Sequence, residues 1–587
     1  MPLLSLLDAP ARYLFFTGKG GVGKTSLATA SAIAFADGGR RVLLVSTDPA
    51  SNLDEILGVA LRNSAIPVAG VERLELLNID PQLAAEAYRA RVLEQMGAQA
   101  TAAEIATVRE ELAGACTTEI AAFDAFAGLL AADDGAYDNV VFDTAPSGHT
   151  LRLLSLPQAW TGFLTDNTRG ASCLGPHSGL EMQESMFRAA LATLTDARTT
   201  TVVLVARPEA GAIAEAARTA AELTTLGLTN QCLIINGVFH ATGADDAVAS
   251  AIEAHGRAAL ETLPAELATL PRDTVPLRDF DVVGLAALRA LLEVTVPAPS
   301  ARPAPASTAA PHADATLGRL ADELAANGHG LIMVMGKGGV GKTTIAAALA
   351  IGLVDRGHAV HLSTTDPAAH LTTTLAGQRD GLTVSRIDPA AETQRYIDKI
   401  MANRGARLSE DERALLLEDL RSPCTEEVAV FHAFSRIVAE ARSAFVVLDT
   451  APTGHSLLLM DATGAYHRQV MRGFEEASTV HIVTPLMRLQ DPDYTRIVLV
   501  TLPETIPVSQ AAALQDDLRR AEIEPYAWVV NRSILAAGTS DPLLRARLDN
   551  EQRQMARMDA GLAARIFVIP WLTTPPVGLS NLAALVD

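Results

Sequence analysis

The chain repeats itself once. The segment GKGGVGKTS at 18–26 returns as GKGGVGKTT at 336–344, and CTTEIAAFDAF from Cys116 returns as CTEEVAVFHAF from Cys424. Further pairs, such as FDTAPSGHTLRLL and LDTAPTGHSLLLM, stand in the same order, and the spacing between partners shrinks slowly without reversing. Chance matches would not stay collinear, so we infer a tandem duplication with small deletions. At 587 residues the chain is also too long for a single core.

A stretch rich in Pro and Ala, VPAPSARPAPASTAAPHADA, separates the two copies. It holds almost no large apolar residue, which is typical of a semi-extended linker. We therefore predict an N-terminal half over 1–295, a linker over 296–316 and a C-terminal half over 317–587.

Within each half, short apolar runs alternate with longer stretches of helical pattern. Runs such as RYLFF, RVLLVS, NVVF, TVVLVA and CLIIN fit strands that are buried on both faces of a parallel sheet. The alternation predicts the α/β class, with a doubly wound, mostly parallel sheet flanked by helices in each half. In such a sheet the loops after the strands meet at one edge, where ligands bind.

The repeated glycine loop is the strongest chemical signal. It follows a strand, opens a helix and has the GxxxxGK[ST] spacing of a P-loop, whose backbone N–H groups cradle phosphates. A glycine turn that binds nothing is the alternative, which two complete matches disfavour. The predicted ATP-binding residues of the loops are Gly18, Gly20, Gly21, Val22, Gly23, Lys24, Thr25, Ser26, Gly336, Gly338, Gly339, Val340, Gly341, Lys342, Thr343 and Thr344.

Individual P-loop side chains have expected partners on the nucleotide. Lys24 and Lys342 would reach the β- and γ-phosphates of ATP, whereas Thr25 and Thr343 would offer a hydroxyl to Mg²⁺.

Two aspartates in each half follow predicted strands and would face the P-loop. Asp48 and Asp366 lie in STDPA and TTDPA, whereas Asp143 and Asp449 end NVVFD and FVVLD. A carboxylate at this place suits Mg²⁺ coordination or orientation of the attacking water. A turn or a helix cap is the alternative for one member of each pair.

Both loops carry an additional lysine near the start, Lys19 and Lys337. In this they resemble the deviant P-loop ATPases, which include the nitrogenase iron protein, the partition ATPases and the tail-anchored protein targeting factor. The resemblance implies that the halves face each other, and that Lys19 serves the second nucleotide site and Lys337 the first. A solvated loop lysine is the alternative.

The same resemblance assigns roles to the strand-end residues. It implies that Asp48 and Asp366 orient the attacking water. It also implies that Asp143 and Asp449 bind the magnesium ion, together with Thr25 and Thr343. It also implies that the asparagines that end CLIIN and AWVVN read the adenine edge, with a plain turn as the alternative; they are Asn236 and Asn531.

Cysteines and histidines also recur in register. Cys116 matches Cys424, and His149 matches His455. If the halves pack about a pseudo-twofold axis, equivalent thiols near that axis would meet and would suit a soft, thiophilic ion. One alternative is that a lone cysteine is a small core residue, as we expect for Cys232 in the apolar run QCLIIN. The alternative for each histidine is an ordinary polar residue of the surface or the core.

The motifs GKGGVGKTS, STDPASNL, GACTTEIAAFDAF and DTAPSGHTLRLL, doubled around a linker, resemble the arsenical pump-driving ATPase family over essentially the whole chain. The resemblance implies an ATP hydrolase that As(III) or Sb(III) stimulates and that drives export of these metalloids through an integral-membrane pump subunit. An arsenite metallochaperone is a further candidate partner. The implied metalloid ligands, in a helical region between the halves, are Cys116, Cys173, Cys424, His149, His455 and Ser422; the Cys173 segment, ASCLGPHSG, has no repeat counterpart.

Charge and composition narrow the partners further. The net charge of −21 argues against binding to nucleic acid and against adsorption to anionic lipid. We expect neither a signal peptide nor a membrane span, because the chain lacks a basic leader and any run of about 18 apolar residues. The expectation is a cytoplasmic, monomeric pseudo-dimer that associates with the inner face of the membrane through its partner.

The closest alternative is the tail-anchored targeting factor, which shields a client helix in a hydrophobic, often methionine-rich groove. The segments that would build the groove, 82–135 and 390–440, contain only Met96 and Met401 as methionines and carry many charged residues. A partition-type module would need a basic surface or an amphipathic helix. An iron–sulfur protein would need four cluster ligands.

Overall fold

The computed structural model describes residues 3–48, 51–95, 101, 112, 115–131, 135–144, 186, 188–294, 314–366, 371–403, 408–420, 423–450 and 484–587. The chain forms two compact units. The first comprises Met1–His240 and Glu253–Ala298, and the second comprises Ala241–Ile252 and Pro299–Asp587. The boundaries at 295 and 316 stay a prediction.

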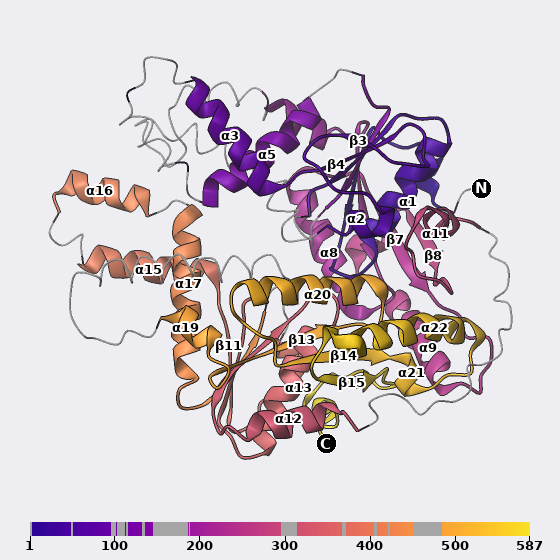
Figure 1. The fold of residues 1–587 in the computed structure, drawn as a ribbon. Helices are drawn as coiled ribbons and strands as arrows, with labels where there is room; N and C mark the ends of the chain where they lie inside the picture. The colour runs from indigo at the N-terminus through magenta and orange to yellow at the C-terminus, as the bar shows by residue number, and fades with distance from the viewer. Residues whose placement is uncertain are drawn as a thin grey trace. The chain divides into compact units, whose positions relative to one another are not determined.

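The first unit is built on a sheet with the strand order β3-β4-β2-β5-β1-β6-β7-β8 (Figure 1). The strands pair in parallel around the central β1, and the short β3 pairs antiparallel with β4. Their bounds are β1 (Tyr13–Thr17), β2 (Val42–Ser46), β3 (Ile66–Pro67), β4 (Leu74–Asn78), β5 (Asn139–Asp143), β6 (Thr200–Ala206), β7 (Gln231–Val238) and β8 (Arg272–Pro276).

Helices cover both faces of this sheet. Between Lys24 and Asp37 at its ends, helix α1 has small or apolar residues on all sides, and it packs between the sheet and α11. On the other face, Phe126 of α5 meets Phe15 and Phe142, whose rings stack with centroids 4.4 Å apart. The helices are α1 (Lys24–Asp37), α2 (Leu53–Leu57), α3 (Pro81–Gln95), α5 (Ala115–Ala131), α8 (Ala210–Thr225), α10 (Ala265–Ala268) and α11 (Leu285–Leu291), with a 3₁₀ turn at Ser5–Leu7.

The second unit repeats this plan without a counterpart of β3. Its strand order is β11-β10-β12-β9-β13-β14-β15, and the neighbouring strands are parallel. The strands are β9 (Gly330–Met335), β10 (Val360–Thr364), β11 (Leu382–Arg386), β12 (Phe445–Asp449), β13 (Thr495–Thr501), β14 (Ala527–Ser533) and β15 (Ile566–Pro570).

Two apolar clusters fill the two faces of the second sheet. One joins the sheet to α12, α13 and α23, and the other includes residues of α17, α20 and α22. The predicted α/β class, with a doubly wound and mostly parallel sheet in each half, is therefore confirmed. The helices are α12 (Leu317–Ala325), α13 (Lys342–Asp355), α14 (Leu371–Leu375), α15 (Pro389–Asn403), α16 (Glu410–Asp419), α17 (Pro423–Glu440), α19 (Pro485–Gln490), α20 (Thr505–Arg520), α21 (Ile534–Ala537), α22 (Pro542–Arg557) and α23 (Leu579–Ala583), with a π turn at Met558–Leu562.

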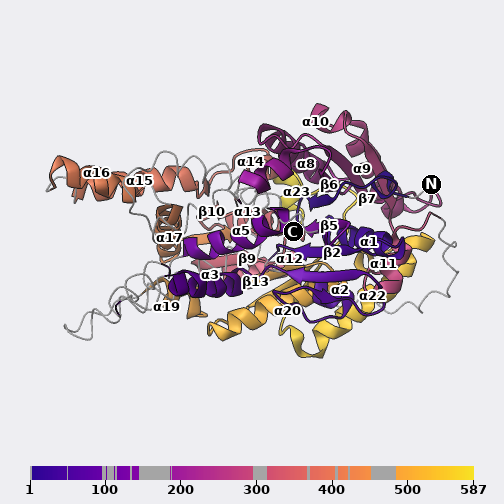
Figure 2. The ribbon, with the colours of Figure 1, turned by 90° about the horizontal axis from the view of Figure 1, so that it is seen from above.

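In each unit two long helices pack against each other. They are α3 and α5 in the first unit and α15 and α17 in the second (Figures 1 and 2). Cys116 and Cys424 each occupy the second position of one of these helices, α5 and α17.

A short piece of the first repeat belongs to the second unit. Asp246, which precedes α9 (Ala247–Glu261), accepts hydrogen bonds at Oδ2 from Thr539 Oγ1 and Ser540 N, both at 2.6 Å, and from Asp541 N at 3.0 Å. Asp541 accepts in return at its own Oδ2 from Thr242 N at 3.0 Å and from Thr242 Oγ1 at 2.8 Å. We call these residues, 242, 246 and 539–541, the aspartate clasp.

The two aspartates of the clasp are equivalent in sequence and in role. Each stands at the same distance after the asparagine in the preceding strand. Each uses Oδ1 to cap its own helix, since Asp246 accepts from Ala249 N and Asp541 accepts from Leu543 N and Leu544 N. The remaining oxygen of each is thereby left to bind the opposite repeat.

Candidate nucleotide sites

Each P-loop joins a central strand to the helix behind it, from β1 to α1 in the first unit and from β9 to α13 in the second (Figure 1). The loops have the same backbone conformation. Their glycines take positive φ angles, which other residues rarely adopt, of 145°, 78° and 93° at Gly18, Gly21 and Gly23 and of 145°, 86° and 98° at Gly336, Gly339 and Gly341.

The side chain of a buried lysine folds back onto each loop and contacts its backbone. Lys24 and Lys342 are only 7% and 6% exposed. Their Nζ atoms donate to the carbonyl oxygens of Lys19 at 3.2 Å and of Lys337 at 3.1 Å. A buried ammonium group requires partners that carry negative charge or lone pairs, which a phosphate chain in the loop would supply.

The two additional lysines are half-buried. Lys19 Nζ lies near the start of α8 in its own unit, where a Cβ added to Gly211 would be 3.6 Å from it. The role of Lys19 and Lys337 in the opposite site stays a prediction.

In the second unit, the P-loop hydroxyl and the strand-end carboxylate are in direct contact. Thr343 Oγ1 donates to Asp449 Oδ2 at 2.8 Å, and Thr364 Oγ1 donates to the same oxygen at 3.2 Å. The other oxygen, Asp449 Oδ1, is buried and has no hydrogen-bond partner in the described part of the chain. Burial raises the pKa of Asp449 to about 6, although Lys342 and Thr343 oppose the rise.

This donor set fits Mg²⁺. The ion prefers hard oxygen ligands and is usually held by one or two carboxylates together with water and phosphate oxygens. A fully buried carboxylate with an unused oxygen beside a P-loop threonine is the environment in which a cation would offset the cost of burial. Asp143, the equivalent residue at the end of β5, is 1% exposed.

The remaining aspartates lie one strand further along the same edge. Asp48 and Asp366 are half-buried and follow β2 and β10, which pair with β5 and β12. The negative charge of Asp366 contributes to the raised pKa of Asp449, so the two carboxylates face a common region. Their assignment to the attacking water stays a prediction.

The strand-end asparagines contact the P-loops. Asn236 Nδ2 donates to Val22 O at 2.8 Å, and Asn531 Nδ2 donates to Val340 O at 2.9 Å. Sequence reasoning placed both asparagines at the nucleotide but missed this contact. The sequence signal for this contact was an asparagine that recurs at the end of an apolar strand in both repeats. This signal does not show in which direction the side chain points.

Most of the predicted metalloid ligands lie outside the described residues. These are His149, His455, Cys173 and Ser422, together with the side chains of Cys116 and Cys424. Among the residues that the structure does describe, no group of three or more His, Cys, Asp or Glu gathers as a metal site. Burial and the charge of Asp273 raise the pKa of the Cys232 thiol to about 12, which makes it a poor ligand.

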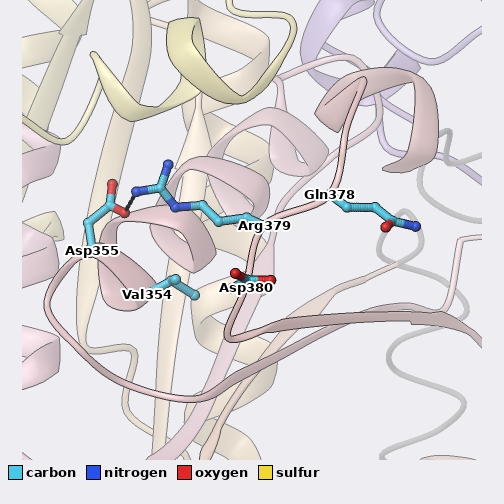
Figure 3. A pocket seen from close by; sticks show the side chains of 5 residues that line it. All are labelled: Val354, Asp355, Gln378, Arg379 and Asp380. Carbon is cyan, nitrogen blue, oxygen red and sulfur yellow. Dashed lines mark hydrogen bonds and ion pairs between the residues drawn. The ribbon is translucent and has the colours of Figure 1, made fainter.

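A surface pocket of the second unit lies away from this edge (Figure 3). Its walls come from the end of α13 and from the segment before β11, at the side where the strands begin rather than end. Two of its lining residues, Arg379 and Asp355, form an ion pair with each other. We therefore assign no nucleotide to this pocket.

No helix in the described ranges is both long and apolar enough to cross a membrane.

Comparison with known proteins extends the evidence to the whole chain. The family described as anion-transporting ATPase matches residues 11–296 and 329–489. An arsenical pump-driving ATPase of Escherichia coli is 50% identical over 577 residues, which cover 98% of each chain. A putative arsenical pump-driving ATPase of Halobacterium salinarum is 31% identical and covers 97% of this chain and 93% of its own.

A more distant relative matches only in part. The ATPase GET3 of Podospora anserina is 32% identical over 40% of this chain and 75% of its own length. The likeness that spans both P-loops is thus to the arsenical pump-driving ATPases.

Proposed function

The chain belongs to the anion-transporting ATPase family and is thus an ATP hydrolase, and we propose that it uses ATP to drive export of arsenite or antimonite through a membrane pump subunit. The observation that carries the proposal is the match, over 98% of both chains, to a relative named for driving an arsenical pump. The geometry of the P-loops supports it, because both loops have the same conformation and the same buried lysine.

In this proposal the chain's own residues divide the work at each site. The P-loop N–H groups and Lys24 or Lys342 bind the β- and γ-phosphates. Asp48 and Asp366 orient the water that attacks the γ-phosphorus, so that an O–P bond forms and the bond to the ADP oxygen breaks. Lys19 and Lys337 stabilise the charge that develops in the site of the opposite repeat.

Magnesium is the proposed cofactor. Thr343 and Asp449 would hold it in the second unit, directly or through water, and Thr25 and Asp143 would do so in the first. The ion would neutralise charge on the phosphate oxygens.

The metalloid is proposed to bind at Cys116, Cys173, Cys424, His149, His455 and Ser422. As(III) and Sb(III) are soft and prefer thiolates, and the two repeat-equivalent cysteines begin equivalent helices. Binding would favour the active state by its higher affinity for that state. The partners would be the pump subunit, at the inner face of the membrane, and a metallochaperone that delivers arsenite, with the chain acting as a monomer.

Steady-state ATP hydrolysis tests this function. We expect arsenite or antimonite to accelerate phosphate release by the purified chain, and we expect a Cys116→Ser, Cys424→Ser double variant to keep basal turnover without that response. The matched control is Cys232→Ser, which should still respond. Equal turnover with and without metalloid in the wild-type chain would contradict metalloid gating while leaving ATP hydrolysis in place.

A further inference from the structure

In each repeat, an asparagine side chain from another strand donates a hydrogen bond to a backbone carbonyl of the P-loop. Asn236 lies in β7, two strands away from β1, so its side chain reaches back past the end of β6 to the carbonyl of Val22. Asn531 in β14 reaches past β13 to the carbonyl of Val340 in the same way. The contact recurs in both repeats at nearly the same distance, 2.8 Å and 2.9 Å, which argues for a shared role.

The next residue in each loop is a glycine, which leaves room for this amide. Gly23 and Gly341 cap α1 and α13 in the left-handed conformation, with φ of 93° and 98°. A Cβ added to Gly23 would lie 2.2 Å from Asn236 Nδ2, and one on Gly341 would lie 2.3 Å from Asn531 Nδ2. The glycine therefore provides both the backbone angle and the space that the amide fills.

The geometry of the peptide bond links this contact to the phosphate. In a trans peptide the C=O and the following N–H point in opposite directions within one plane. The hydrogen bond from Asn236 holds the Val22 carbonyl toward β7, so the Gly23 N–H points to the opposite side of that peptide plane. A phosphate held by the N–H groups of the loop would bind on that opposite side. Asn531 fixes the Gly341 N–H through Val340 in the same manner.

We propose that Asn236 and Asn531 are positioning residues that set the direction of one phosphate-binding N–H in each P-loop. This rests on the nucleotide sites proposed above. It differs from the base-reading role that the family resemblance implies, because orientation of an N–H acts on the phosphates of any nucleotide. In the second unit the other amide atom, Asn531 Oδ1, already accepts a hydrogen bond from Arg532 N at 2.9 Å.

The test separates the phosphates from the base. The full chain carrying Asn236→Ala and Asn531→Ala is titrated by calorimetry, in Mg²⁺, with ATP, with ITP and with inorganic tripolyphosphate. We expect all three dissociation constants to rise by a similar factor, about tenfold, as for the loss of one well-aligned hydrogen bond to a charged group. A rise for ATP alone would overturn the proposal in favour of base reading, and three unchanged constants would overturn both roles.

An isosteric pair of substitutions distinguishes positioning from mere space filling. Asn236→Asp and Asn531→Asp keep the shape of the side chain but place an acceptor against the Val22 and Val340 carbonyls. They should therefore weaken the binding of all three ligands at least as much as the alanine substitutions do. Retention of wild-type affinity by the aspartate variant would contradict the proposal. Asn327→Ala, on an exposed turn, is the matched control, and thermal melting of each variant shows that it is folded.

Failure of the underlying nucleotide sites gives a different result. If the wild-type chain binds neither ATP nor tripolyphosphate, the P-loop assignment itself is wrong and the positioning role falls with it. If the wild-type chain binds both and only metalloid stimulation is missing, the positioning role is still tested in full.

Discussion

At the scale of single residues, the carboxylates that end β5 and β12 combine burial with the proposed binding of magnesium. Asp449 is completely buried, and its burial raises its pKa, so in the chain without ligands its ionised form costs more free energy than that of an exposed aspartate. Such a residue is retained where a bound cation or a developing charge uses it.

We therefore predict that Asp143→Asn combined with Asp449→Asn lowers ATP hydrolysis by about a hundredfold or more, because the proposed Mg²⁺ ligands lose their charge. The same variant should melt at an unchanged or higher temperature in the absence of nucleotide, because a neutral amide is less costly to bury than a carboxylate. Phosphate release and thermal melting measure the two effects. An exposed substitution, Asp380→Asn, is the control, and near-normal turnover in the double variant would refute the assignment.

The sequence singled out these residues as candidates because each signal is local. An aspartate after a run such as FVVL and a threonine after GK have few alternative positions once the strand and the helix are recognised. The contact from Asn531 to Val340 was not predictable in the same way, since it depends on a side-chain direction that the spacing of strands and the intervening β13 determine. Residue type and position were thus accessible, whereas hydrogen-bond partners were not.

At the scale of elements, the continuous apolar runs predicted the central strands well. The strands β1, β2 and β5 are buried at every position, which is the pattern expected of a parallel sheet covered on both faces. The edge strand β3 was not anticipated, because two residues, Ile66 and Pro67, carry no measurable periodicity.

The junction between β9 and α13 provides an element-scale prediction. Gly341→Ala should destabilise the chain by about 1–2 kcal/mol from the left-handed φ alone and by more from overlap with the Asn531 amide. In a chain that already carries Asn531→Ala the overlap is absent, so the cost of Gly341→Ala should be smaller by about 0.5–3 kcal/mol. Denaturant unfolding of the four chains of this cycle measures the coupling; strictly additive effects would show that the glycine and the asparagine act independently.

At the scale of the whole molecule, the duplication explains the repeated sheet order but did not reveal the aspartate clasp. Hydrogen bonds that join Asp246 to residues 539–541 leave no trace in local periodicity. What the sequence does contain is a pair of aspartates at equivalent positions, and each is a plausible helix cap by itself. The second use of each carboxylate becomes visible only when Ala241–Ile252 is found in the second unit.

The clasp makes stability depend on pH in a defined direction. Burial alone would raise the pKa of Asp246, but hydrogen bonds from Ala249, Thr539, Ser540 and Asp541 outweigh burial and hold that pKa well below its usual range. The pKa of an aspartate in an unfolded chain is about 3.9, so the ionised Asp246 stabilises the folded chain above that pH. The contribution is lost as the pH falls toward and through the folded pKa.

We predict that Asp246→Asn lowers the free energy of unfolding of the second unit by about 1–3 kcal/mol at pH 7, because its amide nitrogen cannot accept the N–H and O–H groups of residues 539–541. Hydrogen exchange should accelerate at the amides of Ser540 and Asp541, which lose their acceptor. The difference from the wild-type chain should shrink as the pH is lowered below about 4, since the unfolded chain then binds a proton at Asp246 that the folded carboxylate binds only at a still lower pH. Asp245→Asn, at the exposed neighbouring position, should change neither quantity. A constant difference at every pH would mean that the charge of Asp246 contributes nothing and that only its shape holds the clasp.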